Sequence, residues 1–175
     1  GQFLFRQNEI RLCGDSAEII LEDNRGNHRA STFVSVGDVP FISRFRWYYG
    51  PCGYAFRKSR NGAIQGLHAF LLRPQRDQVI DHRDGDRLNN RRGNIRLCTR
   101  KQNSRNMQPR GGISKYKGVT YDPKKKLYRA RICVDRQRIG LGRFKSEIAA
   151  AKAYDEAAIK YFGEFARTNE EVVQE

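Results

Sequence analysis

The residues best suited to chemistry lie in one polar segment, IDHRDGDRLNNRRGNIRLCTRKQNSRN (80–106). Asp81 and His82 end a β-like stretch, and Asn103 falls one turn inside a short helix predicted to follow. Hydrolysis of a phosphodiester needs a hard cation on the phosphate and a base for the attacking water. Asp81 and Asn103 offer the oxygen donors that Mg²⁺ or Mn²⁺ accepts, and His82 is the natural base, because an unperturbed imidazole has a pKa of about 6.5.

The same residues also have a purely structural interpretation. An Asp-His pair before a DGD sequence is more often part of a hydrogen-bonded turn than of a catalytic site, and DGD and LNN are common turn formers. His68 stands alone in the apolar run GLHAFLL, where a histidine is more often a core residue than a participant in catalysis. Residue chemistry alone leaves both interpretations open.

The charge of the chain favours a polyanionic partner. The 175 residues include 34 Lys and Arg against 19 Asp and Glu, which gives a formal net charge of +15. Residues 61–110 are the most basic part, with 11 basic and 4 acidic side chains, and such a segment repels itself unless a polyanion lies against it. We expect nucleic acid rather than a membrane, since no basic amphipathic helix accompanies the charge.

Hydropathy and cysteine usage predict a soluble intracellular protein with small cores. Hydrophobic residues make up 38% of the chain and the mean hydropathy is −0.77. No run approaches the roughly 18 apolar residues of a membrane span, and the opening GQFLFRQNEIRL does not resemble a secretory signal. The four cysteines are far apart, so we expect free buried thiols rather than zinc ligands or disulfides. A cytoplasmic location, in a bacterium or a phage-infected cell, is the expectation.

The pattern of short apolar runs and turns predicts an α+β protein. Residues 9–42 and 47–57 are expected to form short antiparallel strands, whereas 66–72 suits either a buried strand or a helical turn. Two strands are predicted at 78–82 and 94–98, with a polar excursion between them and a helix at 100–107 after them. QPRGGISK (108–115) is the candidate linker.

After the linker the pattern restarts as a second small domain. We predict strands at 116–121, 127–134 and 137–144, with a turn at Asp135-Arg136, and a helix over 146–163. Ser146 and Gly163 are expected to cap that helix. The apolar stripe expected to cover one face of the sheet comprises Ile148, Ala151, Tyr154, Ala158, Tyr161 and Phe162.

The polar segment 78–107 as a whole resembles the HNH nuclease motif, the ββα-metal unit of phage and intron-borne homing endonucleases. Asp81-His82 matches the first element, Asn94 the central Asn and Asn103 the last position, where some members have His and others Asn. The resemblance implies that Asp81 and Asn103 ligate one divalent metal ion, that His82 activates the water, and that Asn94 ties the loop that orients the imidazole. An Asn at the last position favours Mg²⁺ or Mn²⁺ over Zn²⁺ or Ni²⁺.

The surroundings of the motif extend this resemblance. WYYGPCGYAFR and the later His68 are similar to the strand-rich leader of such enzymes, although Ala69 stands where the family more often has Arg. His68 is therefore a possible site residue. Five arginines around the motif are the expected phosphate contacts: Arg91, Arg92, Arg96, Arg100 and Arg105.

Residues 114–169 resemble a second family, the plant-type Apetala-two (ethylene-response-factor) DNA-binding domain, through YKGV, LGRF and AAAKAYDEAAIKYFGEFARTN. Strand alternation places Tyr128, Ala130 and Ile132 on one face, toward the helix, and the arginines between them on the other, where a three-stranded sheet can enter the major groove. An ordinary Arg-rich solvent face fits the alternation equally well. The family's groove-facing positions, transferred to this chain, imply DNA contacts by Lys117, Thr120, Lys124, Arg131 and Arg138. Arg129, on the same strand face as Arg131, is a further expected contact.

Together these observations predict a metal-dependent, site-directed DNA endonuclease of the HNH homing type. The nuclease domain with its leader is expected at 1–110 and the DNA-binding domain at 111–175. The partner would be double-stranded DNA, and a monomer is slightly favoured. The main alternative is a noncatalytic, sequence-specific DNA-binding regulator, and an RNA-binding protein is a third possibility.

Overall fold

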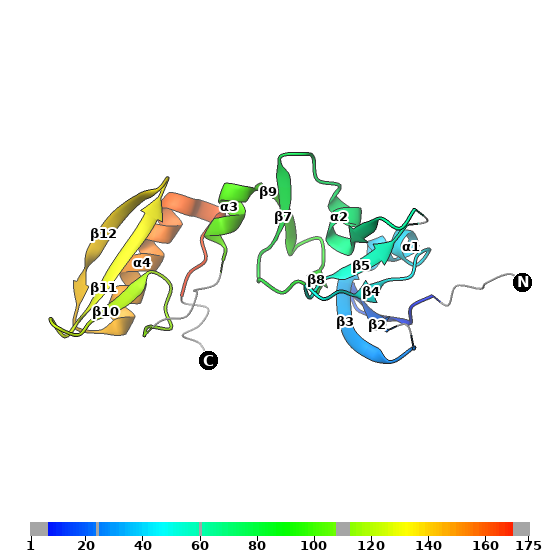
Figure 1. Cartoon of the computed structure of the whole chain (residues 1–175), viewed down its shortest axis with the longest axis horizontal. Coiled ribbons are helices and arrows are strands. Elements are labelled where there is room, and N and C mark those ends of the chain that lie inside the picture. The colour runs from blue at the N-terminus through cyan, green and yellow to red at the C-terminus, as the bar shows by residue number, and fades with distance from the viewer. Residues whose placement is uncertain (1–6, 24, 60, 108–112, 170–175) are drawn as a thin grey trace, which may run out of the picture. The chain divides into compact units, whose positions relative to one another are not determined.

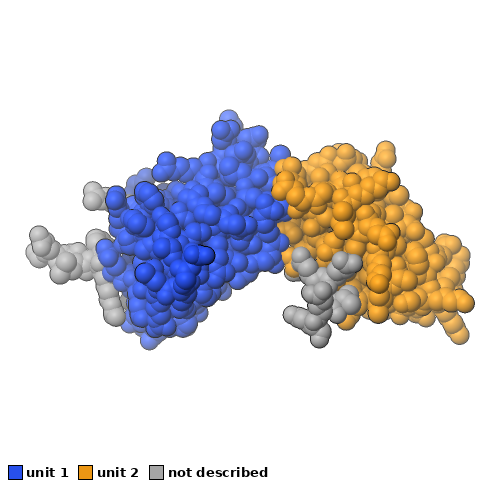
Figure 2. Space-filling view, turned by 180° about the vertical axis from the view of Figure 1, so that it is seen from behind, with its two compact units in different colours: residues 1–100 blue, residues 101–175 orange. Residues whose placement is uncertain are grey.

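A computed structural model describes residues 7–23, 25–59, 61–107 and 113–169. The chain divides into two compact units, residues 1–100 and 101–175, which Figure 2 shows in blue and orange. The boundary falls at the start of helix α3 (Arg100–Arg105). Most of the predicted linker, residues 108–112, lies outside the described residues.

In the part of the first unit that the structure describes, the strands form three small sheets. Figure 1 shows their arrangement. The largest has the order β1-β2-β3-β8, in which β1 (Ile10–Cys13), β2 (Ser16–Glu22) and β3 (His28–Ser35) are antiparallel. The second contains β4 (Tyr48–Tyr49), β5 (Ala55–Lys58) and β6 (Ile64–Gly66), and the third pairs β7 (Gln78–His82) with β9 (Ile95–Thr99). Two short helices, α1 (Val39–Ile42) and α2 (Leu67–Leu72), complete the unit after a 3₁₀ turn at Val36–Asp38.

The core of the first unit holds these small sheets together. Alternate residues of β2, among them Ile19 and Leu21, pack with residues of the helices and with Trp47, whose indole donates to the carbonyl of Ile42 at 2.9 Å. The segment 66–72, for which the sequence suited either a buried strand or a helical turn, forms helix α2. Its helix ends where Arg73 takes a left-handed conformation (φ 48°) before a proline.

The predicted strand, loop, strand and helix of the motif are confirmed. The strands β7 and β9 pair antiparallel, with Asp81 opposite Arg96 and His82 opposite Ile95. The helix α3 ends at Arg105, two residues before its expected end. The excursion also contains a strand that the pattern did not predict, β8 (Asn89–Asn90), which pairs parallel with β3 and thereby attaches the loop to the large sheet.

The second unit is the predicted three-stranded antiparallel sheet with a helix on one face (Figure 1). Its strands are β10 (Val119–Asp122), β11 (Leu127–Val134) and β12 (Gln137–Phe144), followed by α4 (Glu147–Phe162) and a 3₁₀ turn at Gly163–Phe165. Ser146 accepts a hydrogen bond from the amide of Ala149 and Gly163 follows the last turn, which confirms both predicted caps. Gly118 has φ +77°, and an added Cβ would lie 2.0 Å from the Tyr154 ring, so the strand approaches α4 closely only because this residue is glycine.

The buried stripe of α4 is only partly the predicted one. Ala151, Tyr154, Ala158 and Phe162 are buried as expected. Ile148 and Tyr161, in contrast, are 47% and 40% exposed. The helix instead buries two further small residues, Ala150 and Ala157. Alanine side chains at these positions let the helix backbone approach the sheet closely.

Two further expectations concern thiols and membranes. All four cysteines are free as predicted, but only Cys98 is buried, and Cys13, Cys52 and Cys133 are exposed. The expectation of buried thiols was therefore wrong for three of them, which lie near strand ends or in turns rather than in a core. Among the described residues, no helix combines the length and the apolar character that crossing a bilayer requires.

Candidate functional site

His82 is the buried centre of a hydrogen-bonded chain in the first unit. Its Nε2 lies 3.3 Å from Oδ1 of Asn90, whose Nδ2 donates to Oγ1 of Thr32 at 2.9 Å. The Thr32 hydroxyl in turn donates to the carbonyl of Leu88 at 2.6 Å. Because an amide oxygen faces Nε2, that ring nitrogen carries the proton and Nδ1 carries the lone pair. Asn90 and Thr32 therefore fix both the orientation and the tautomer of the imidazole.

Burial keeps this imidazole neutral. Desolvation lowers the pKa of His82 below its ordinary value, against the opposing effects of the Asn90 hydrogen bond and of nearby carboxylates. A neutral imidazole at pH 7 has a lone pair with which to accept a proton, as a general base must. Asn90 is not among the residues predicted from the sequence, although its place in the LNN turn could have indicated a polar anchor.

Asn94 binds the loop that follows His82. Its Nδ2 donates to Oδ1 of Asp84 at 2.9 Å and to the carbonyl of Asn89 at 2.7 Å, and its Oδ1 accepts from the amide of Asp84 at 3.2 Å. One amide side chain thus joins both sides of the 83–89 excursion. This is the arrangement expected of a residue that ties the loop, while its role in catalysis stays a prediction.

Asp81 forms a buried ion pair with Arg96 on the neighbouring strand. Arg96 Nε and Nη2 lie 2.9 and 2.7 Å from Asp81 Oδ2, and the two side chains are 9% and 4% exposed. The guanidinium is therefore directed at the carboxylate that is the predicted metal ligand. A cation at Asp81 has to share the carboxylate with Arg96 or displace it.

The predicted metal ligands fall on opposite sides of the unit boundary. Asp81 belongs to the first unit and Asn103, half-buried on α3, to the second. Among the described residues no group of three or more His, Cys, Asp or Glu side chains is arranged to hold a metal ion. Asp81 and Asn103 each carry a hard oxygen donor of the kind that Mg²⁺ or Mn²⁺ accepts, and their joint ligation of one ion stays a prediction.

His68 lies beside His82. Their ring centroids are 5.6 Å apart with an edge-to-face geometry, and the Tyr54 ring lies 4.9 Å from His68. Desolvation, with a smaller contribution from His82, lowers the pKa of His68 to about 4. Its buried Nδ1 has no hydrogen-bond partner among the described residues. His68 is therefore a neutral ring packed against the His82 imidazole.

The arginines around the motif differ in their surroundings. Arg92 holds the buried Asp38 with three hydrogen bonds of 2.8 to 3.1 Å, and Arg91 lies over the Phe33 ring at 5.1 Å. Arg96 pairs with Asp81, as described, whereas Arg100 is exposed at the start of α3. The structure thus gives Arg92 and Arg96 internal partners, and their contact with phosphate stays a prediction.

The open face of the β10–β12 sheet carries a row of basic side chains. Arg131 and Arg138 are exposed, as is Thr120, and Arg129 pairs with Asp122 at 3.5 Å. Lys124 is exposed in the β10–β11 turn. The opposite face, with Ala130 and Ile132, is buried under α4. The predicted division of β11 into a core face and a basic face is confirmed.

A β-bulge adds an arginine that strand alternation missed. The register of β11 and β12 shifts between Ala130 and Arg131, so that Arg143 lies opposite Arg129. Strict alternation from Arg138 would have turned Arg143 toward the helix. The glycines on either side of Leu141 are the signal that could have revealed the bulge, since glycine in a strand often marks one.

Lys117 is more enclosed than a DNA contact is expected to be. Its Nζ donates to the carbonyl of Arg105, the last residue of α3, at 2.5 Å, and its backbone amide donates to Asn169 Oδ1 at 2.7 Å. Burial lowers the pKa of its ammonium to about 8. The amine therefore caps α3 in this structure, and its role in DNA binding stays a prediction.

Comparison with known proteins identifies both parts of the chain. Residues 74–105 match a family described as HNH endonuclease, and residues 114–164 match the AP2 domain. The chain is also 33% identical over 143 residues to an uncharacterized HNH endonuclease of Acanthamoeba polyphaga mimivirus, an alignment that covers 78% of this chain and 73% of that protein. Both resemblances seen in the sequence are confirmed.

Proposed function

The chain belongs to the HNH endonuclease family, and we propose that it is a metal-dependent endonuclease of the homing type that cuts double-stranded DNA at sites chosen by its AP2 domain. The observation that carries the proposal is the buried, neutral His82, oriented by Asn90 and Thr32 next to the carboxylate of Asp81. A catalytic base needs a fixed orientation and an unprotonated ring at working pH, and the Asn90–Thr32 chain and the burial of His82 supply these.

The proposed chemistry is hydrolysis of one phosphodiester bond. Asp81 and Asn103 would hold one Mg²⁺ or Mn²⁺ ion, which when bound neutralises charge on the scissile phosphate and on the leaving oxygen. His82 accepts the proton of the attacking water, and the Asn90 amide, hydrogen-bonded to Nε2, stabilises the imidazolium that results. Asn94 keeps the 83–89 loop closed so that the imidazole does not move. One catalytic unit per chain favours nicking by a monomer.

The two proposed domains divide this work. The nuclease domain spans 1–110 and the DNA-binding domain 111–175. Phosphate contacts from Arg91, Arg92, Arg96, Arg100 and Arg105 would position the duplex, and the AP2 sheet would contact base edges. The proposed contacts on that sheet are Lys117, Thr120, Lys124, Arg129, Arg131 and Arg138, to which the register of β12 adds Arg143.

Plasmid nicking tests this proposal. Supercoiled plasmid incubated with the protein and Mg²⁺ or Mn²⁺ should yield nicked circles, and His82→Ala should abolish the reaction while retaining DNA binding. His28→Ala is the matched control, because His28 is an exposed histidine of the same unit. Equal nicking by His82→Ala and His28→Ala would remove His82 from the mechanism.

The noncatalytic alternative is favoured by one observation, the Asp81–Arg96 ion pair. A guanidinium on the metal-ligand carboxylate is what a protein that uses the motif only as a scaffold would show. That alternative predicts DNA binding with no nicking at any divalent-ion concentration. Under either function, log K should fall with log salt by about 0.9 per phosphate contacted, and removal of the exposed phosphate contact proposed for Arg100, in Arg100→Ala, should reduce the slope.

A further inference from the structure

The helix that carries Asn103 is too short to be stable by its own hydrogen bonds. Its six residues, Arg100–Arg105, form fewer than two turns. Helices shorter than about 12 residues are marginal in water and depend on tertiary contacts. The position of Asn103 therefore depends on whatever holds α3 in place.

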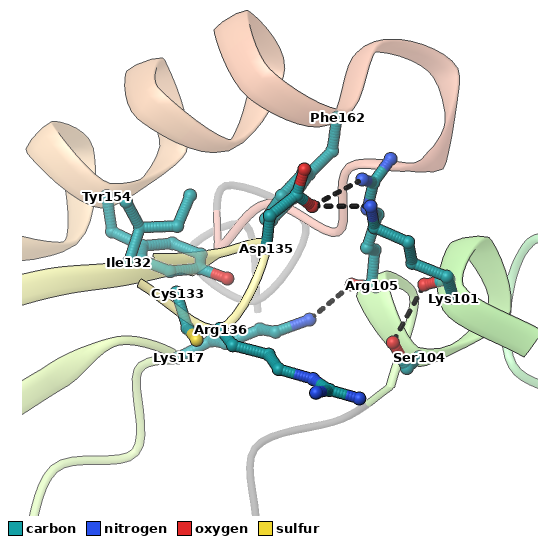
Figure 3. Close-up of a pocket in the computed structure, with 10 residues that line it drawn as sticks. All are labelled: Lys101, Ser104, Arg105, Lys117, Ile132, Cys133, Asp135, Arg136, Tyr154 and Phe162. Atoms are coloured by element: carbon teal, nitrogen blue, oxygen red, sulfur yellow. Dashed lines mark hydrogen bonds and ion pairs between the residues drawn. The ribbon is translucent and has the colours of Figure 1, made fainter. Parts of the chain in front are cut away.

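Asp135 supplies the charged part of that contact. It lies in the turn between β11 and β12, and its Oδ1 is 2.6 Å from Nζ of Lys101 and 3.9 Å from Nη2 of Arg105 (Figure 3). Lys101 and Arg105 lie one turn apart on α3, so a single carboxylate binds both ends of the same helical face. The pKa of Asp135 is lowered, chiefly by the hydrogen bond from Lys101.

Two further contacts within the second unit secure the end of α3. Lys117 donates to the carbonyl of Arg105, and the Arg105 guanidinium lies 4.7 Å from the centre of the Phe162 ring of α4. An ammonium at a helix C-terminus donates a hydrogen bond to an otherwise unpaired carbonyl and interacts favourably with the negative end of the helix dipole. The last helix of the nuclease motif is thus held by three elements of the AP2 domain: the turn before β10, the β11–β12 turn and α4.

We propose that Asp135 is a positioning residue for DNA cleavage, which holds α3 through Lys101 and Arg105 and so fixes Asn103. The inference rests on the proposed function, because the place of Asn103 affects cleavage only if Asn103 serves the nuclease site. Asp135 acts through α3 and contacts neither the substrate nor the ion.

Asp135→Asn in the full chain is a direct test. Asn tolerates the left-handed conformation that Asp135 adopts (φ 51°), so the turn is retained while the charge is lost. Because Asp135 is 60% exposed, the change leaves no buried charge unpaired. Glu156→Gln is the matched control, since it removes one carboxylate from an exposed position on α4 of the same unit.

Three quantities are measured on both variants and on the wild type. They are the hydrogen exchange of the α3 amides without metal, the affinity for a labelled DNA duplex, and the rate of plasmid nicking. For Asp135→Asn we expect faster α3 exchange and slower nicking, each by about two- to five-fold, because an exposed ion pair is only weakly stabilising. DNA affinity should be equal or higher, because a negative charge is lost.

A charge exchange separates positioning from general destabilisation. Lys101→Glu alone should mimic Asp135→Asn, and Lys101→Glu combined with Asp135→Lys should recover part of the nicking rate and of the α3 protection. If Asp135→Asn matches Glu156→Gln in both exchange and nicking, the positioning role is wrong and the proposed function stands. If the wild type does not nick DNA, the proposed function fails, and the exchange data then decide only whether Asp135 holds α3.

Discussion

The buried ion pair between Asp81 and Arg96 allows a quantitative prediction about the metal-free protein. In Arg96→Met the side chain keeps an apolar stem of similar length, but the Asp81 carboxylate loses two hydrogen bonds of 2.7 and 2.9 Å. Asp81 is 4% exposed, so water cannot replace them freely. Breaking one partner of a buried pair costs about 3–5 kcal/mol, and we expect about 3 kcal/mol because methionine keeps part of the packing of the arginine stem.

A divalent ion should reverse much of this loss. A cation at Asp81 neutralises the carboxylate that has lost Arg96 as its partner. Binding of the ion stabilises the folded protein by RT ln(1 + [L]/Kd), where [L] is the free ion concentration and Kd its dissociation constant, which gives about 2.7 kcal/mol when [L] is 100 times Kd. In the wild type the guanidinium competes for the same carboxylate. The stabilisation by Mn²⁺ should therefore be larger in Arg96→Met than in the wild type.

Urea unfolding with and without Mn²⁺ measures both effects. With a slope of about 2 kcal/mol/M, a loss of 3 kcal/mol lowers the midpoint of the first unit by about 1.5 M. Arg25→Met, an exposed arginine of the same unit, is the control and should unfold like the wild type. If Arg96→Met is as stable as Arg25→Met, or if Mn²⁺ does not stabilise it further, the assignment of Asp81 as a paired metal ligand is refuted.

Three other predictions concern particular side chains. The pKa of His68 is lowered to about 4 from 6.5, so the stability it contributes is complete above pH 6.5 and is lost as the pH falls toward 4. His68→Phe should reduce the fall in unfolding free energy between pH 6.5 and 4.5 by up to about 3 kcal/mol, and an unchanged fall would contradict the burial argument. Asn169→Ala removes the hydrogen bond that Asn169 Nδ2 donates to Asp155 Oδ1 at 2.8 Å and the one that Asn169 Oδ1 accepts from the Lys117 amide at 2.7 Å, and it should destabilise the second unit by about 1–3 kcal/mol in thermal unfolding, with the first unit unchanged. Gly118→Ala should lower DNA affinity and the stability of the second unit together, because its Cβ would overlap Tyr154 in a left-handed backbone; normal affinity at normal stability would show that the strand can move away.

Local pattern was sufficient for most of the elements. Alternation in LYRARICV identified which face of β11 meets α4, and the change from period two to a helical period located α4 with both of its caps. Local pattern failed where a distant segment decided the outcome. The strand β8 exists because Asn89 and Asn90 pair with β3, more than 50 residues earlier, and no feature of the LNN turn specifies that partner.

For the candidate site, the residue types of the sequence, together with their resemblance to known motifs, indicated the chemistry. Asp81, His82, Asn94 and Asn103, at their spacing, indicated the nuclease family, and the basic residues of β11 and β12 indicated a DNA-binding sheet, because donor chemistry and short-range periodicity are properties of the local chain. Only the tertiary structure decided what each side chain contacts. It pairs Arg96 with Asp81, assigns Asn90 to His82 and attaches α3 to Asp135, since these contacts join residues that are brought together by strand register and packing across the fold.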